Sequence, residues 1–372
     1  MTSPNELNPD YCPHPGEVLA RVLQTQGVRQ SELAERTGLS AKHVNQMIRK
    51  SIGISPDVAV LLERALSVPA DFWNRADAAF EEFEAHQRAT KALAEYTGWA
   101  NQFDRSTLVR HRVINASDTG TILVEKLLKF FQVATPTAFE QTWLQPSVSF
   151  RRSQAFTIHE PNTALWLRLV ERCASTQPVA AFNPRLLRKA AKAIPALTTM
   201  SVPNGFIAAR AALAEAGVAL TFVREVPCTR ACAATWWITA ERPAIGITER
   251  HRRADVFWFN LLHEIGHIAL HPRRSSYLNL DNTQDSADPD EDEANTFAGE
   301  ALFPGDTSNQ IRQARNQQDL ILIAARLGIG VTTVAGRYGN LTGKWNIVSR
   351  LREPISEDDI AALEAAVEEL TA

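Results

Sequence analysis

The spacing of apolar residues predicts a chain that is mainly helical. From about Val18 to Tyr96, apolar residues recur three or four positions apart, which is the period of helices with one buried face. Gly27 and Gly38 interrupt this pattern, and Pro69 precedes its longest stretch. We therefore expect four short helices followed by a long one.

The pattern changes in the second half of the chain. Residues 97–200 keep the helical period without a chemical motif, and we interpret them as a helical connector with its own core. After Pro203, β-branched and aromatic residues gather in three short runs, and a strongly apolar helical segment follows and stops at Pro272. The expected order is helix 206–216, strands at 218–223, 233–238 and 244–247, helix 254–270, a polar surface loop at 273–290, and a helix from Asp290 to near Pro304.

These elements predict an all-α N-terminal domain and a small α+β domain in a mainly α protein. The predicted divisions are a flexible tail (1–13), an all-α domain (14–87), a helical connector (88–200), an α+β domain (201–352) and a C-terminal helix (353–372).

The composition of the chain limits the kinds of partner that the protein can bind. The formal net charge is −3, so any contact with nucleic acid must come from a local basic patch rather than from the whole chain. Four cysteines in this length do not form a disulfide framework, and we expect free thiols in a reducing cytoplasm. No signal peptide and no apolar run of the ~18 residues needed to cross a bilayer are present, so we expect no membrane partner.

One motif carries metal chemistry. His263, Glu264 and His267 form the pattern H-E-x-x-H inside the apolar helical segment. Residues four apart share a helix face, so both imidazoles can reach one ion, here predicted as Zn²⁺. Glu264 lies beside them and suits a general base that acts on a water molecule. A pair of structural histidines on a helix is the alternative for this pattern taken alone.

A second segment supplies a third ligand. Glu291 and Asn295 are four apart on another predicted helix, so Glu291 can bind the metal while Asn295 accepts a hydrogen bond from a ligand histidine. Glu293 competes for the ligand role, and an acidic helix N-terminus is the alternative interpretation of these carboxylates. His271 lies about 12 Å along the helix axis from His263, too far to share the ion while the helix continues. We interpret it as a helix-end or substrate-side residue.

The residues around this site resemble the ImmA/IrrE family of metallopeptidases. The resemblance rests on FWFNLLHEIGH from Phe257, EDEANTFA from Glu291, and the pair Leu302 and Pro304, and it extends over about residues 200–350. It implies a small α+β zinc peptidase whose substrate is a repressor protein. It also implies a helical segment after the site, near 320–338, that is itself similar to a helix-turn-helix. Some members have Asp where this chain has Asn295.

Residues 28–50 predict a helix, a glycine turn and a second helix that would enter the DNA major groove. Asn and Gln can read adenine, while Lys and Arg can hold phosphate or guanine. A plain helical hairpin with a polar face gives the same pattern. The candidate DNA contacts on and around the second helix are Ser40, its expected N-cap, then Lys42, His43, Asn45, Gln46, Arg49 and Lys50.

This module resembles the HigA-type antitoxins of the Xre helix-turn-helix class over residues 14–85. The segments that carry the resemblance are HPGEVL from His14, QSELA from Gln30, VNQM from Val44, ISPD from Ile54, and FW at Phe72. It implies a homodimer on operator DNA, a phosphate contact by Gln30, and, in some members, a toxin partner.

Two functions follow from these patterns. The first is a DNA-binding regulator with a zinc endopeptidase that cuts a repressor or antitoxin. The second is a non-enzymatic HigA-like antitoxin or autorepressor whose zinc site is structural or degenerate. Glu264 favours the first, because a structural zinc site needs no general base.

Overall fold

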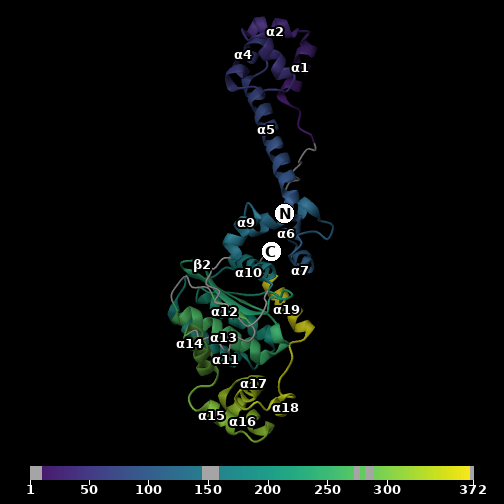
Figure 1. Ribbon diagram of the computed structural model, residues 1–372. Helices are drawn as coiled ribbons and strands as arrows, with labels where there is room; N and C mark the ends of the chain where they lie inside the picture. Colours follow the sequence, from purple (N-terminus) through teal and green to yellow (C-terminus); the bar gives the residue numbers. More distant parts are fainter. Residues whose placement is uncertain (1–10, 145–158, 272–276, 281–288, 369–372) are drawn as a thin grey trace. The chain divides into compact units, whose positions relative to one another are not determined.

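The computed structural model describes residues 11–144, 159–271, 277–280 and 289–368 (Figure 1). The chain divides into two compact units. Unit 1 comprises Met1–Thr97 and Thr119–Glu125, and unit 2 comprises Gly98–Asp118 and Lys126–Ala372. The described residues include no helix that is both long and apolar enough to cross a membrane. They include all four cysteines, and no disulfide joins them.

Unit 1 is built from the helices that the apolar spacing predicts. They are α1 (Pro15–Gln26), α2 (Gln30–Thr37), α3 (Ala41–Ile48), α4 (Pro56–Leu66) and the long α5 (Ala70–Leu93). Gly27 and Gly38 end α1 and α2 with positive φ angles of 67° and 72°, a conformation that glycine adopts without strain. Ser40 begins α3, because its Oγ accepts a hydrogen bond from the backbone N–H of His43.

The core of unit 1 gathers apolar side chains from all five helices, with Leu33, Val44 and Trp73 fully buried among them. Helices α1 and α3 approach very closely at Gly16. A Cβ atom placed there would lie 1.9 Å from the carbonyl oxygen of Met47. The glycine at this position is therefore required by packing.

Short helices and turns follow α5 in the chain. They are η1 (Ala94–Tyr96), α6 (Thr97–Ala100), α7 (Arg105–Arg110), α8 (Gly120–Phe131), α9 (Pro136–Phe139) and the π-helical turn η2 (Glu140–Leu144). Trp99, Phe103, Phe131 and Phe139 pack ring against ring, with centroids 4.7–5.5 Å apart. Two longer helices follow, α10 (Glu160–Thr176) and α11 (Pro184–Leu197).

A four-stranded sheet lies at the centre of unit 2. Its strands are β1 (Ala219–Phe222), β2 (Ala231–Thr239), β3 (Arg242–Ile247) and β4 (Tyr277–Leu280), in the order β1-β3-β2-β4. β1 runs parallel to β3, whereas β2 is antiparallel to both β3 and β4. The prediction of a surface loop throughout 273–290 was wrong for Tyr277–Leu280. This four-residue run is too short for periodicity to reveal, and its pairing with β2 makes it a strand.

The remaining helices of unit 2 are α12 (Val202–Glu215), η3 (Arg250–Arg252), α13 (Ala254–Leu270), α14 (Pro289–Leu302), α15 (Thr307–Gln313), α16 (Gln317–Leu327), α17 (Val331–Thr342), α18 (Trp345–Val348) and α19 (Glu357–Glu368). Of these, α12, α13 and α19 contact the sheet, and so does α10. One apolar core joins α11, α12, β1, β2, β3, α13, α17 and α19. Arg352 fastens the C-terminal segment to the start of α13, with Nη2 2.7 Å from Asp255 Oδ2. The fold is therefore mainly α with a small mixed sheet, which confirms the predicted class.

The segment similar to a helix-turn-helix after the metal motif consists of α16, a turn at Gly328 and α17. Gly328 has a φ of 67°, as such a turn requires. However, most of α17 is buried, and a Cβ at Gly336 would lie 2.1 Å from Asp255 Oδ2 at the start of α13. This second helix packs against α13, the helix that carries the H-E-x-x-H motif, so its buried face cannot read DNA.

Candidate metal centre and DNA-binding face

The two helices of the metal motif are held close together. α13 is buried along most of its length, because apolar side chains such as Phe257, Leu261 and Ile265 face the core. Gly266 lies against α14, where an added Cβ would be 3.2 Å from the Cα of Ala294. The small residues at these two positions allow donor atoms from α13 and α14 to meet.

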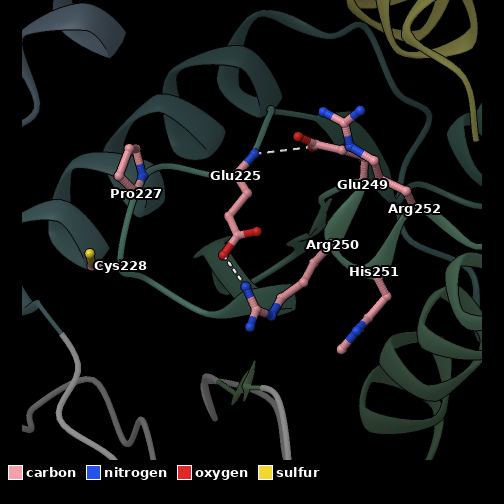
Figure 2. Close-up of a pocket in the computed structure, with 7 residues that line it drawn as sticks. All are labelled: Glu225, Pro227, Cys228, Glu249, Arg250, His251 and Arg252. Atoms are coloured by element: carbon pink, nitrogen blue, oxygen red, sulfur yellow. Dashed lines mark hydrogen bonds and ion pairs between the residues drawn. The ribbon is translucent and has the colours of Figure 1, made fainter.

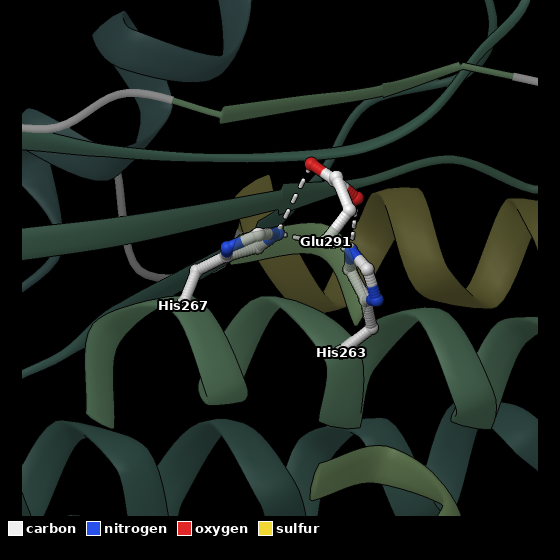
Figure 3. A group of neighbouring side chains, drawn as sticks. All are labelled: His263, His267 and Glu291. Carbon is white, nitrogen blue, oxygen red and sulfur yellow. Dashed lines mark hydrogen bonds and ion pairs between the residues drawn. The ribbon is translucent and has the colours of Figure 1, made fainter. Parts of the chain in front are cut away.

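Three side chains converge at this contact (Figure 3). The Nε2 atoms of His263 and His267 lie 3.0 Å apart. Glu291 Oε2 is 3.1 Å from His263 Nε2, and Glu291 Oε1 is 3.5 Å from His267 Nε2. Both imidazoles are almost fully buried, whereas the Glu291 side chain retains 13% exposure. The spacing predicted from sequence is thus realised in space.

The donor set fits a metal ion. Donor atoms at 2.0–2.1 Å from a tetrahedral zinc ion lie roughly 3.3 Å from one another, close to the separations within this group. Two imidazoles and one carboxylate also form a ligand set typical of catalytic zinc, which keeps its fourth position open for water or substrate. His263, His267 and Glu291 could therefore bind a metal ion, because their donor atoms all lie within 4.8 Å of one another.

Glu264 is positioned differently from the other acidic residues. It is fully buried, and Thr235 on β2 donates a hydrogen bond of 2.6 Å to its Oε2 atom. Its Oε1 atom is buried without a hydrogen-bond partner. Burial raises the pKa of Glu264 to about 7, against the lowering effects of His263 and Thr235. A carboxylate in this state can take up and release a proton near neutral pH. Sequence reasoning missed Thr235, because its strand carries no motif.

The two histidines differ in their protonation. Burial lowers the pKa of His267, and the neighbouring His263 and His271 lower it further, so this imidazole is neutral. Burial also lowers the pKa of His263, but its hydrogen bond to the Glu291 carboxylate and the charge of Glu264 raise it above its usual value overall. Glu291 therefore favours a positive charge on His263, and a metal cation in the same place would replace that charge.

The remaining candidates near the motif have distinct places. Asn295 Oδ1 lies 3.0 Å from His263 Nδ1, on the opposite side of the ring from the donor group. Glu293, considered as a competing ligand, is exposed, and its carboxylate lies 3.5 Å from His271 Nε2. His271 lies just beyond α13, with Nδ1 3.0 Å from His267 Nδ1. It contacts a candidate ligand rather than joining the three donors.

The candidate DNA contacts share one part of unit 1. Lys42 and Arg49 are exposed, while His43, Asn45 and Gln46 are partly buried on α3. Val44 and Met47 face the core, which directs the polar side chains between them outward. Gln30 and Ser40, at the start of α2 and at the N-cap of α3, are exposed.

Lys50 has a partner within the protein. Its Nζ atom forms an ion pair with Glu17, and the Tyr11 hydroxyl donates to the same carboxylate. The hydrogen bonds from Lys50 and Tyr11 lower the pKa of Glu17. A DNA phosphate must therefore compete with Glu17 for Lys50, a competition that the sequence pattern did not reveal.

Unit 2 also contains a pocket of about 570 Å³ beyond the carboxyl ends of β1 and β3 (Figure 2). Arg250 forms an ion pair with Glu225, and Glu249 Oε2 accepts a 3.1 Å hydrogen bond from the Glu225 backbone N–H. Burial raises the pKa of Glu249. The pocket shares no lining residue with the three metal donors.

Two protein-family models match the chain. Residues 230–338 match an IrrE N-terminal-like domain, and residues 19–73 match a helix-turn-helix. A search of curated proteins gave no match. The first range contains His263, Glu264, His267 and Glu291, and the second contains α2 and α3. The chain therefore carries a helix-turn-helix DNA-binding domain followed by an IrrE N-terminal-like metallopeptidase domain, as its sequence predicted.

Proposed function

We propose that this protein is a DNA-binding regulator that carries a zinc-dependent endopeptidase, and that its substrate is a repressor or antitoxin protein. One observation carries the proposal. The donor atoms of His263, His267 and Glu291 converge beside Glu264, whose buried Oε1 atom has no hydrogen-bond partner. A bound zinc ion would supply Lewis acidity toward water and a peptide carbonyl.

Glu264 is the general base in this proposal. Its Oε2 atom is held by Thr235, so Oε1 remains to accept a proton from the attacking water. The same carboxyl group then passes that proton to the amine that leaves when the peptide bond breaks. Burial excludes solvent from Glu264, which limits loss of the proton to bulk water.

The regulatory part of the proposal rests on unit 1. Two copies of the domain would place two α3 helices in successive major grooves, about 34 Å apart, on a pseudo-palindromic operator. The contacts in each copy would be Gln30, Ser40, Lys42, His43, Asn45, Gln46, Arg49 and Lys50. A dimer doubles the phosphate contacts of a module with few basic residues, and affinity for DNA grows with their number. The similarity to HigA-type antitoxins is the support for a toxin partner.

The peptidase proposal is tested with Glu264→Gln in the full chain. The wild type and the variant are loaded with zinc and incubated with a proteome-derived peptide library, and new N-termini are counted by mass spectrometry. Glu264→Gln keeps the size and burial of the side chain but cannot accept the proton. We expect both proteins to hold zinc and the wild type alone to cut peptides.

Two outcomes oppose the proposal. Equal cutting by Glu264→Gln and wild type would exclude Glu264 as the base. Zinc binding by both proteins with no cutting of the library or of operon-encoded repressors would favour the non-enzymatic regulator with a structural metal site.

A further inference from the structure

His271 contacts His267, one of the proposed metal ligands, at the ring nitrogen that does not face the other donors. It lies directly after the last residue of α13, and its backbone N–H still bonds to the His267 carbonyl at 3.1 Å. Its ring Nδ1 lies 3.0 Å from His267 Nδ1, and only 3% of the side chain is exposed. We propose that His271 is a positioning residue that fixes the tautomer and ring orientation of His267 for metal binding. This inference rests on the proposed metal function.

The chemistry of the contact restricts the proton positions. Two imidazole nitrogens 3.0 Å apart form a hydrogen bond only when one carries a proton and the other offers a lone pair. If His267 Nδ1 donates, its Nε2 lone pair faces His263 and Glu291, as a metal ligand requires. In the opposite arrangement, the Nε2 proton of His267 would occupy the position of the ion. Metal binding is therefore compatible only with His271 as the acceptor.

The surroundings of His271 favour that role. An acceptor Nδ1 in a neutral ring leaves the proton on Nε2, which lies 3.5 Å from Glu293 Oε2 and 4.0 Å from Asp290 Oδ1. Both carboxylates attract a proton on Nε2 rather than on Nδ1. They belong to α14, the helix that also supplies Glu291.

Each of the two ligand histidines then has a side chain that accepts a hydrogen bond from its Nδ1 atom. Asn295 Oδ1 lies 3.0 Å from His263 Nδ1, and a carbonyl oxygen can only accept a hydrogen bond. His271 Nδ1 holds the corresponding position behind His267. Partners of this kind orient ligand imidazoles and increase their basicity, and their loss typically weakens metal affinity about 10–100-fold.

The experiment compares three substitutions of His271 in the full chain by zinc titration against a competing chelator. An Asn side chain places its polar atoms near the Nδ1 position of histidine, whereas a Gln side chain places them near Nε2. We expect His271→Ala and His271→Gln to bind zinc about 10–100-fold more weakly, and His271→Asn to stay within about threefold of the wild type. Leu270→Ala is the matched control, because this neighbour is exposed.

The outcomes separate the inference from the proposed function. If His271→Ala binds zinc like the wild type, or if His271→Asn is as weak as His271→Gln, the positioning role is wrong while the metal site stands. If the wild type itself binds no zinc, the proposed function fails first. Thermal unfolding without metal identifies a variant that does not fold. If His271→Ala does not fold, the difference in zinc affinity between His271→Asn and His271→Gln still tests the positioning role.

Discussion

The candidate metal group on α13 and α14 and the proposed recognition helix α3 were both predicted from short helical patterns, but they differ in how much of the site lies inside the protein. His263 and His267 are buried, and each ring contacts both another donor and a supporting side chain. The polar residues of α3 lie at the surface, and DNA would supply their partners. A substitution in the metal group therefore removes contacts that form within the protein, whereas a substitution on α3 removes contacts that form only with DNA.

The largest expected effect is the loss of metal. His263→Ala removes one of three donors, so we expect zinc content to fall from about one ion per chain to near zero. The measurement is elemental analysis of the purified full chain. Glu300→Gln is the control, because Glu300 is an exposed carboxylate on the same helix as Glu291 and lies outside the donor group. Binding of a duplex DNA should be unchanged in both variants, and zinc retained by His263→Ala would refute the ligand assignment.

The sequence predicted the parts of the site that depend on spacing within a helix. His263 and His267 meet because residues four apart share a face, and Glu291 reaches them because α14 packs on α13 at Gly266. Residues brought in by tertiary contacts carry no such spacing. Thr235 reaches Glu264 from a strand 29 positions away in sequence. The role of β4 likewise depends on its pairing with β2, which no local pattern encodes.

The recognition helix offers a second illustration. The apolar spacing predicted which residues of α3 face the core, and Val44 and Met47 are fully buried. It could not predict the ion pair of Lys50 with Glu17, 33 positions apart, because that contact follows from the packing of α1 against α3.

The next largest effect concerns the packing of α1 against α3, the helix of the proposed DNA-binding face. In Gly16→Ala, the new Cβ would lie 1.9 Å from the Met47 carbonyl oxygen, so α1 and α3 must separate. We expect unit 1 to lose ~1–3 kcal/mol of stability and the full chain to bind DNA more weakly, although no polar atom is removed. Chemical denaturation and a gel shift measure the two effects. Gly98→Ala is the control, since nothing lies near its added Cβ. If Gly16→Ala has the stability and DNA affinity of the wild type, close packing is not the reason for this glycine.

Acid should weaken unit 2 by a route that is separate from the metal group. Burial lowers the pKa of His111 to about 4, with Glu364 raising it and Arg110 and Arg172 lowering it. The unfolded chain, with an ordinary histidine pKa near 6.5, binds more protons between these values. Stability is therefore lost as pH falls from about 6.5 toward 4, at up to about 1.4 kcal/mol per pH unit.

His111→Gln removes this titration. Zinc-loaded wild type and variant are unfolded by denaturant at pH 7 and pH 5, where we expect the wild type to lose up to about 2 kcal/mol more than the variant. Effects of acid on the metal group are common to both proteins and cancel in the difference. Equal losses would show that His111 accepts a proton in the folded state as readily as in the unfolded state.

The smallest effect concerns two adjacent cations next to the recognition helix. Arg49 is exposed, whereas Lys50 is paired with Glu17, so binding of Lys50 to a phosphate must first break that ion pair. Each phosphate contact contributes about 0.9 to the slope of log affinity against log salt. With a random-sequence duplex, we expect Arg49→Ala to reduce this slope by about one unit and Lys50→Ala to reduce it by clearly less. Glu17→Gln should release Lys50, so that Lys50→Ala in that background costs about as much slope as Arg49→Ala. Equal slopes for the two single variants in the wild-type background would mean that DNA displaces Glu17 freely. The internal ion pair would then not distinguish the two cations on this face.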